Sequence, residues 1–192
     1  MTLRERTTRR ILDAADELFF SRGVAATPID AVIARAGVSA ATLYRGFPSK
    51  DALLAAALER RHTGWIDAWD AAIRRADDET SRLLAVFDAL DDFRARPGAA
   101  RWCAFLAASA EYAIAPAEVA AAVSRDTASL RSRLTELARP LAGDDAPRLA
   151  EQLLVVITGG LAMRLREPGR SARPDRDIAA ALLDRLTSGR SS

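Results

Sequence analysis

The chain has 192 residues, of which 49% are apolar, and its formal net charge at pH 7 is +2. A chain of this length and apolar content can bury a substantial core, so an intrinsically disordered protein is excluded. The single cysteine, Cys103, excludes an intrachain disulfide, and the single histidine, His62, leaves little material for a His-rich metal site or a Cys/His catalytic pair.

Basic side chains are concentrated toward the N-terminus. Residues 1–50 carry eight basic and five acidic side chains, a net of +3, whereas the rest carry 20 basic and 21 acidic side chains, a net of −1. This distribution indicates contact with a polyanion at the basic end. The longest apolar run, LLVVITGGLAM at 153–163, is far shorter than the roughly 20 residues that span a bilayer, and MTLRERTTRR lacks the apolar core of a signal peptide. We therefore expect a soluble, cytoplasmic protein without a membrane partner.

Three helices are predicted in the first 46 residues. Apolar side chains recur at helical spacing over 3–22, and Gly23 is placed to end that helix. Thr27 is predicted to cap the second helix, with Pro28 at its first helical position. After the turn 36–39, Ser39 is predicted to cap a third helix over 40–46, which Pro48 ends because the residue before a proline avoids helical geometry.

The rest of the chain has the pattern of a larger, all-helical body. Ser49 is predicted to cap a long helix from about 50 to 75, and Pro140 is expected to end the seventh helix, before a polar break at 142–147. No segment alternates with the period of a strand. We expect an all-α fold of about nine helices, the last five near 79–95, 98–113, 115–139, 147–166 and 176–188.

The segment 28–46 has the organisation of a helix-turn-helix, in which a first helix braces a second helix whose exposed residues enter the major groove. Gly37 can adopt the left-handed conformation that the tight turn needs. Val38 and Leu43 are placed to fill the core between the helices, and Phe47 is expected to be a core aromatic residue. The exposed side of the second helix then carries Ala40, Ala41, Thr42, Tyr44 and Arg45.

These residue types suit contact with duplex DNA. Threonine and tyrosine hydroxyls suit phosphates, and arginine suits phosphates or guanine edges. Thr27 and Ser39 stand at predicted helix N-termini, which favour a phosphate, and Lys50 lies in the first turn of the next helix. Partial packing in the core stays an alternative for Tyr44. The predicted DNA contacts are Thr27, Pro28, Ser39, Ala40, Ala41, Thr42, Tyr44, Arg45 and Lys50.

The sequence GVSAATLYRGFPSKDAL at 37–53 closely resembles the signature of the TetR/AcrR family of transcriptional repressors, and ILDAADELFFSRGVAATPIDAVIARA at 11–36 resembles the first two helices of that family. The chain departs from the signature at Gly46, where the family usually has an aromatic residue or histidine, and at Ala40, which is often lysine or another polar residue. Both departures remove potential DNA contacts. The matching positions are Gly37, Ser39, Thr42, Leu43, Tyr44, Phe47, Lys50 and Leu53.

The resemblance implies a helix-turn-helix domain over 1–48 and a ligand-binding and dimerisation domain over 49–192. It implies a homodimer without enzymatic activity or cofactor that binds a palindromic double-stranded DNA operator. It also implies a small-molecule effector that weakens DNA binding by favouring another conformation. We expect a repressor that is released by a small apolar or amphipathic effector, and a ligand-independent helix-turn-helix regulator is the alternative.

Aromatic and apolar side chains on the middle helices are candidates for the lining of an effector pocket, with Glu111 or Arg101 as a polar anchor. The alternative for each aromatic residue is ordinary core packing. Cys103 is expected to be a small buried hydrophobe, and a redox sensor would need exposure and cationic neighbours. The predicted pocket residues are Trp65, Trp69, Phe87, Trp102, Phe105, Leu106, Glu111 and Tyr112.

The last two helices are expected to form the dimer interface, as they do in the family that the chain resembles. Gly159 and Gly160 lie inside a predicted helix, where each glycine costs about 1 kcal/mol relative to alanine. That cost favours close helix approach at an interface, and a local kink is the alternative. The predicted interface residues are Leu153, Val156, Ile157, Gly160, Leu161, Leu182, Leu183 and Leu186.

Two other classes of function compete with a DNA-binding regulator. An enzyme would need a catalytic group, and the main candidate is an acidic cluster of Asp88, Asp91 and Asp92 that has the spacing to hold Mg²⁺. No second cluster or phosphate-binding loop accompanies it. A helical adaptor protein that does not bind DNA is the other rival.

Overall fold

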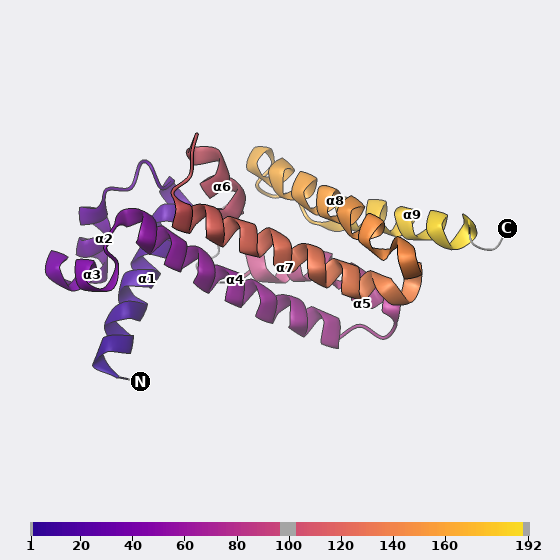
Figure 1. Cartoon of the computed structure of the whole chain (residues 1–192), viewed down its shortest axis with the longest axis horizontal. Coiled ribbons are helices and arrows are strands. Elements are labelled where there is room, and N and C mark those ends of the chain that lie inside the picture. Colours follow the sequence, from indigo (N-terminus) through magenta and orange to yellow (C-terminus); the bar gives the residue numbers. More distant parts are fainter. Residues whose placement is uncertain (1, 97–102, 190–192) are drawn as a thin grey trace. The chain divides into compact units, whose positions relative to one another are not determined.

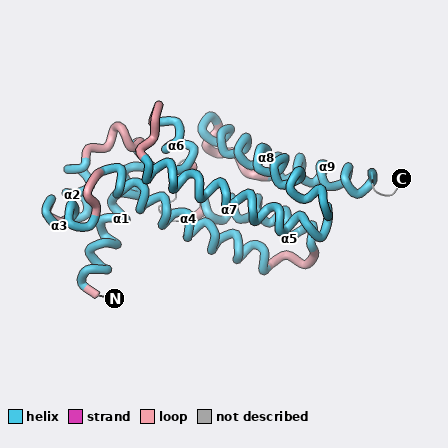
Figure 2. Tube along the Cα trace, in the orientation of Figure 1, coloured by secondary structure: helices cyan, strands magenta, loops and turns pink. Residues whose placement is uncertain are grey.

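The computed structural model of the protein describes residues 2–96 and 103–189 (Figure 1). Within these ranges the chain forms nine α-helices and one short 3-10 helix, and no strand is present (Figure 2). The expected all-α class is therefore confirmed. The helices are α1 (Leu3–Arg22), α2 (Ile29–Ala36), α3 (Ala40–Gly46), α4 (Lys50–Arg74), α5 (Glu79–Arg94), α6 (Ala104–Glu111), α7 (Ala117–Ala142), η1 (Gly143–Asp145), α8 (Ala146–Arg166) and α9 (Arg173–Gly189).

Local capping bonds fix several helix ends. The hydroxyl of Thr2 accepts the N–H of Glu5 at 3.1 Å, and the Glu5 carboxylate accepts the N–H of Thr2 at 2.7 Å, so two free amides at the start of α1 are satisfied reciprocally. Gly23 ends α1 with a φ of 94°, a value that L-residues with side chains rarely adopt. Asp78 caps α5 by accepting the N–H of Ser81 at 2.7 Å, and this bond holds the pKa of Asp78 below its usual value.

Two predicted ends in the second half of the chain are wrong. α7 runs through Pro140 and ends at Ala142, because a proline in the last turn removes only one intrahelical hydrogen bond before the helix stops. α6 ends at Glu111, since Tyr112 has extended backbone angles of φ −114° and ψ 125°. Part of the predicted helix at 98–113 lies outside the described residues.

The chain forms two compact units, Met1–His62 with Ala100–Arg125, and Thr63–Ala99 with Asp126–Ser192. Both α4 and α7 therefore contribute residues to each unit. The limits of these two units reflect how densely the residues pack. The predicted boundary between residues 48 and 49 instead separates two functions, DNA binding and ligand binding with dimerisation, and it stays a prediction.

The first unit has a core that joins α1 to α4 with α6 and the start of α7. Phe19 and Phe20 on α1 and Leu43 on α3 are almost completely buried, and Ala104 and Ala108 bring α6 into the same core. At about 25 cal/mol per Å² of apolar surface, a buried Phe or Leu side chain contributes about 1.5–3 kcal/mol. This core holds the helix-turn-helix as one body.

The second unit has an aromatic core of its own. The rings of Trp65 and Trp69 lie 5.6 Å apart, and Phe93 meets Trp65 edge-on at 5.9 Å. Leu83 and Phe87 of α5 pack in the same cluster, together with α7, α8 and α9. Edge-to-face and tilted ring pairs at these distances are favourable beyond the area that they bury.

Close approach of α8 and α9 within the second unit depends on Gly160. A Cβ atom at Gly160 would overlap the carboxylate of Asp175, which is buried and is held by Arg170 in a two-bond ion pair at 2.7 and 2.8 Å. A Cβ atom at Gly159, in contrast, would face open space, with no neighbouring atom within 4 Å. Gly160 therefore does allow the close helix approach that the glycine pair predicts. The helix that approaches it is α9 of the same chain.

Across the residues that the structure describes, none of the helices has both the length and the apolar character needed to cross a bilayer.

Candidate nucleic-acid interface

The turn between α2 and α3 is built on Gly37, which has left-handed backbone angles of φ 61° and ψ 45°. The guanidinium of Arg10 on α1 donates to the carbonyls of Ala36 at 2.5 Å and Gly37 at 2.9 Å. The backbone conformation disfavours a larger residue, and a Cβ at Gly37 would lie 2.7 Å from Nη2 of Arg10, so the end of that side chain would have to shift. Sequence reasoning missed Arg10, because a contact across 26 residues has no local pattern.

Helix α3 has one face in the core and one face in solvent. Leu43 is 0% exposed and Phe47, just after the helix, is 9% exposed, which confirms the expectation that both are core residues. On the other side Ala40, Ala41 and Arg45 are exposed, and Tyr44 is 46% exposed. Tyr44 thus presents almost half of its surface to solvent. The exposed side of α3, its outward surface, therefore carries small residues at its start and an aromatic and a cationic residue farther on.

Two hydroxyls are organised at the start of α3. Ser39 is the N-cap, as predicted, and its Oγ accepts the N–H of Thr42 at 3.2 Å. The same Oγ lies 2.9 Å from Oγ1 of Thr42. Ser39 is exposed and Thr42 is half-buried, so this hydroxyl pair lies at the edge of the outward surface of α3.

Thr27 does not lie on this surface. It is 1% exposed, and its hydroxyl donates to the carbonyls of Gly23 at 2.7 Å and Leu18 at 3.2 Å. Its predicted role as N-cap of α2 is wrong, because Pro28 holds that position and α2 begins at Ile29. Thr27 instead fixes the turn after α1, and a buried hydroxyl with two acceptors is unavailable to a phosphate. Pro28 is exposed.

Lys50 stands at the first position of α4 and is half-buried. Its ammonium lies 6.0 Å from the centre of the buried Phe19 ring, within the range of a cation–π contact. The preceding Ser49 accepts the N–H of Ala52 at 2.9 Å, which confirms the predicted cap.

Uncompensated positive charge gathers on α1 and α3. Elsewhere in the first unit arginines pair with carboxylates, as Arg35 does with Glu17 at 2.6 Å and Arg60 does with Asp13 at 2.7 Å. No such carboxylate partner is present, in the described part of this unit, for Arg4, Arg6, Arg9, Arg22 or Arg45. The N-terminal excess of basic residues is therefore free to interact with a polyanion.

Comparison with known proteins agrees with this geometry. Residues 11–57, which contain the whole helix-turn-helix, match the family described as bacterial regulatory proteins, tetR family. The full chain is also similar to the crystal structure of a TetR-family transcriptional regulator from Streptomyces coelicolor, with 28% identity, a TM-score of 0.84, and coverage of 95% of this chain and 96% of that chain. Residues 11–57 form a TetR-family helix-turn-helix domain.

Curated relatives match this chain over slightly less than half of its length. The HTH-type transcriptional activator FasR of Mycolicibacterium smegmatis is 37% identical over 90 residues, which are 47% of this chain and 41% of that protein. An HTH-type transcriptional repressor of Mycobacterium tuberculosis is 38% identical over 89 residues, which are 44% of this chain and 47% of that protein. The matched part thus spans less than half the length of these relatives, one of which is an activator and the other a repressor.

The two departures from the TetR signature lie on the surface of the HTH domain. Ala40 is exposed at the first position of α3, and Gly46 is its exposed last residue. A Cβ at Gly46 would have no neighbouring atom within 4 Å. The absence of a side chain there is therefore not required by packing, and it leaves a gap in the outward surface of α3.

The predicted pocket residues are divided between the cores of the two units. Trp65, Trp69 and Phe87 are packed in the core of the second unit, whereas Phe105 and Tyr112 pack against the core of the first. Leu106 is half-buried on α6 and Glu111 is exposed, whereas Arg101 and Trp102 lie outside the described residues. Periodicity alone could not separate a pocket lining from a filled core, because both place aromatic side chains on the inward face of a helix.

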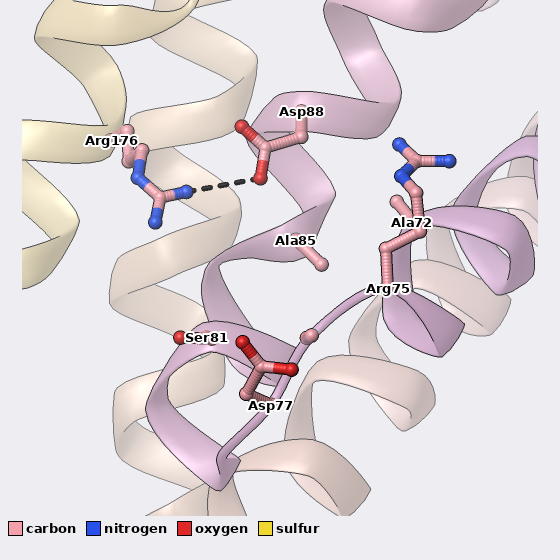
Figure 3. Close-up of a pocket in the computed structure, with 8 residues that line it drawn as sticks. Ala72, Arg75, Asp77, Ser81, Ala85, Asp88 and Arg176 are labelled. Carbon is pink, nitrogen blue, oxygen red and sulfur yellow. Dashed lines mark hydrogen bonds and ion pairs between the residues drawn. The ribbon is translucent and has the colours of Figure 1, made fainter.

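A pocket of about 210 Å³ is present in the second unit, with a different lining (Figure 3). Arg176 of α9 donates to Asp88 of α5 at 3.1 Å on one side, and Arg75 lies across from this pair. The volume is below the roughly 300–1,000 Å³ of typical small-molecule sites, and the walls are polar. Its lining residues are Ala72, Arg75, Ala76, Asp77, Ser81, Ala85, Asp88 and Arg176.

The acidic cluster on α5 is neutralised by arginines. Asp88 pairs with Arg176 at 3.1 Å, Asp92 with Arg75 at 2.5 Å, and Asp91 with the buried Arg164 at 2.8 Å. Each carboxylate thus has a separate cationic partner, which leaves no set of oxygens turned toward a shared Mg²⁺ ion. In the described ranges, no group of three or more His, Cys, Asp or Glu residues has the arrangement of a metal site.

The predicted dimer residues are divided between the core and the surface. Leu153, Ile157, Gly160 and Leu183 are buried within the second unit, so a partner chain cannot reach them without rearrangement. Val156, Leu161, Leu182 and Leu186 are half-buried. Apolar side chains that are largely exposed on these two helices are instead Val155 (71%), Leu165 (51%) and Ile178 (53%).

Proposed function

We propose that this protein is a transcriptional regulator that binds duplex DNA through α3, with its outward face in the major groove. The observation that carries the proposal is the separation of faces on α3, with Leu43 buried and Tyr44 and Arg45 exposed. A hydrophobic anchor on one side and hydroxyl, aromatic and guanidinium groups on the other are what groove recognition requires. Lys50 and the unpaired arginines of α1 provide positive charge for phosphates.

We further propose that the protein binds a palindromic operator as a two-fold dimer. Support comes from α8, where Val155, Gly159 and Leu165 lie on one exposed face together with the exposed Thr158 and Ala162. These residues recur at three- and four-residue spacing, which places them on a common side of the helix. A dimer of this kind presents its two α3 helices to successive major grooves, about 34–36 Å apart.

Repression relieved by a small-molecule effector is the regulatory scheme that we propose. The scheme requires only that the effector bind a conformation with lower DNA affinity, with a coupling of typically about 1–3 kcal/mol. Ligand-independent regulation is a second candidate. It is favoured by the packing of Trp65, Trp69 and Phe87 in a filled core and by the small size of the polar pocket near Arg75. A change in operator affinity on addition of a compound, measured across a small-molecule library, separates the two schemes.

The test of DNA binding is footprinting on the DNA that flanks the gene, followed by titration of the protected duplex and of an unrelated duplex. We expect a protected palindrome. Tyr44→Ala weakens operator binding, and Lys50→Ala both weakens it and reduces the salt dependence of log K by about one unit of slope, as expected for one phosphate contact. Both variants should keep the wild-type helical content and oligomeric state. Unchanged operator affinity in both would contradict the assignment of this face.

A further inference from the structure

Side chains at the end of α6 contact two segments that flank the helix-turn-helix and are distant from α6 in the sequence. The Glu111 carboxylate accepts the backbone N–H of Val24 at 2.9 Å and that of Ala25 at 2.6 Å. A Cβ at Gly23 would lie 3.4 Å from Oε1 of Glu111, an ordinary van der Waals distance, so Glu111 packs directly against this turn. The two amides belong to the turn between α1 and α2, outside any helix, and Glu111 satisfies both of them with one charged group.

The next residue makes a second anchor. The hydroxyl of Tyr112 donates to Oδ1 of Asp51 at 2.8 Å. Burial, together with this hydrogen bond, raises the pKa of Tyr112 above its usual value, so the phenol stays protonated and remains a donor at neutral pH. Asp51 is the second residue of α4 and follows Lys50 directly.

The two anchored segments border the proposed DNA surface. The turn at Val24 and Ala25 leads into Pro28 and α2, Asp51 adjoins Lys50 at the start of α4, and α3 lies between them in the chain. The two residues that make these contacts are consecutive in sequence. Glu111 is the last residue of α6, and Tyr112, which follows it, has extended backbone angles. One short segment of α6 thus contacts both flanks of the helix-turn-helix.

We propose that Glu111 and Tyr112 are positioning residues of the DNA-binding surface, which fix the turn before α2 and the start of α4 against the end of α6. The inference rests on the proposed function. Neither Glu111 nor Tyr112 is proposed to contact DNA. Base recognition requires several contacts to form at once, whereas binding to unrelated duplexes uses phosphate contacts that tolerate displacement. Loss of the two anchors should therefore reduce operator affinity much more than affinity for unrelated DNA.

The test compares Glu111→Gln, Tyr112→Phe and the double variant with the wild-type full chain. Hydrogen bonds to charged groups are among the stronger ones, so we expect roughly a three- to tenfold loss of operator affinity for each single variant and a larger loss for the double variant. Affinity for an unrelated duplex should stay within about twofold, and the salt slope should not change, because no phosphate contact is removed. Glu118→Gln is the matched control, since it removes the same charge from an exposed residue nearby.

A merely structural role gives a different result. In that case the variants unfold at a lower thermal midpoint. At temperatures well below that midpoint, the ratio of operator affinity to unrelated-duplex affinity then equals that of the wild type. This result would overturn the inference. Hydrogen exchange of the Val24 and Ala25 amides is a readout that does not use DNA. We expect these amides to exchange faster in Glu111→Gln than in the wild type. If Glu111→Gln folds poorly, Glu111→Asp takes its place. Exchange at wild-type rates would also overturn the inference. If the wild-type protein itself does not distinguish any operator from unrelated DNA, the proposed function fails instead.

Discussion

At the scale of single residues, glycines have separate and identifiable roles. Gly37 supplies a left-handed turn under the guanidinium of Arg10, and Gly160 gives Asp175 room beside α8. Gly46, by contrast, has free space around it. Each role follows from backbone angles and neighbouring atoms, which the identity of the residue does not reveal.

Replacement of Gly37 by alanine is expected to lower the free energy of unfolding by about 1–2 kcal/mol, because an L-residue is disfavoured in left-handed geometry. The new Cβ would also lie 2.7 Å from Nη2 of Arg10, which a small shift of the end of that side chain relieves. Urea denaturation measures the change. Gly46→Ala is the matched control and should leave stability unchanged or slightly higher, since alanine favours helix and no atom is displaced. An equal loss in both variants would contradict this account.

At the scale of secondary-structure elements, α1 has two parts. From Ile11 onward it contributes to the core of the first unit, whereas no residue from Thr2 to Arg10 with a described side chain is buried. The first part carries Arg4, Arg6 and Arg9 at the positive end of the helix dipole, an arrangement that is unfavourable for the isolated helix. DNA bound at this end would offset that cost.

Arg6→Ala combined with Arg9→Ala should therefore weaken binding to all duplexes alike and reduce the salt slope of log K by about 0.9 for each phosphate that the variant no longer neutralises. Fluorescence titration at several salt concentrations measures the slope. Arg74→Ala with Arg139→Ala removes the same charge from exposed residues of the second unit and should leave the slope at its wild-type value. A wild-type slope in the α1 variant would show that these arginines remain solvated.

At the scale of the whole molecule, the chain consists of two units with separate cores, and apolar surface on the second unit remains uncovered. Val155 on α8 is 71% exposed although its neighbours in sequence are buried or half-buried. Burial of such residues against a second copy is favourable at about 25 cal/mol per Å² of apolar surface. A two-fold interface on this face would use the same residues twice.

We expect light scattering at micromolar concentration to show a dimer for the wild-type protein and a monomer for Val155→Glu, because the substitution places two like charges in the proposed interface. Any fall in the thermal midpoint of Val155→Glu should come from the loss of the dimer and not from a weakened protomer, since Val155 has little contact within its own chain. Ile114→Glu, at a residue that is 91% exposed in the first unit, is the matched control and should remain dimeric. A monomeric wild type would refute the proposed dimer.

The sequence by itself determined the features that depend on neighbours a few residues away. The helical class, the limits of α1 and α3, the glycine turn at Gly37, the cap at Ser39 and the burial of Leu43 and Phe47 all follow from periodicity, capping and turn chemistry within short windows. For the same reason, the resemblance to TetR-family proteins could be read from the contiguous segment 11–53.

Only the tertiary structure decided what the side chains contact across the chain. Thr27 is a buried turn residue, Trp65 and Trp69 fill a core, and Glu111 holds amides that lie 86 and 87 residues away in sequence. Apolar periodicity shows that a face is turned inward but not whether a cavity, a core or a partner chain covers it. A polar residue at a helix end likewise gives no local sign of a distant partner, because that partner is brought near only when the units fold.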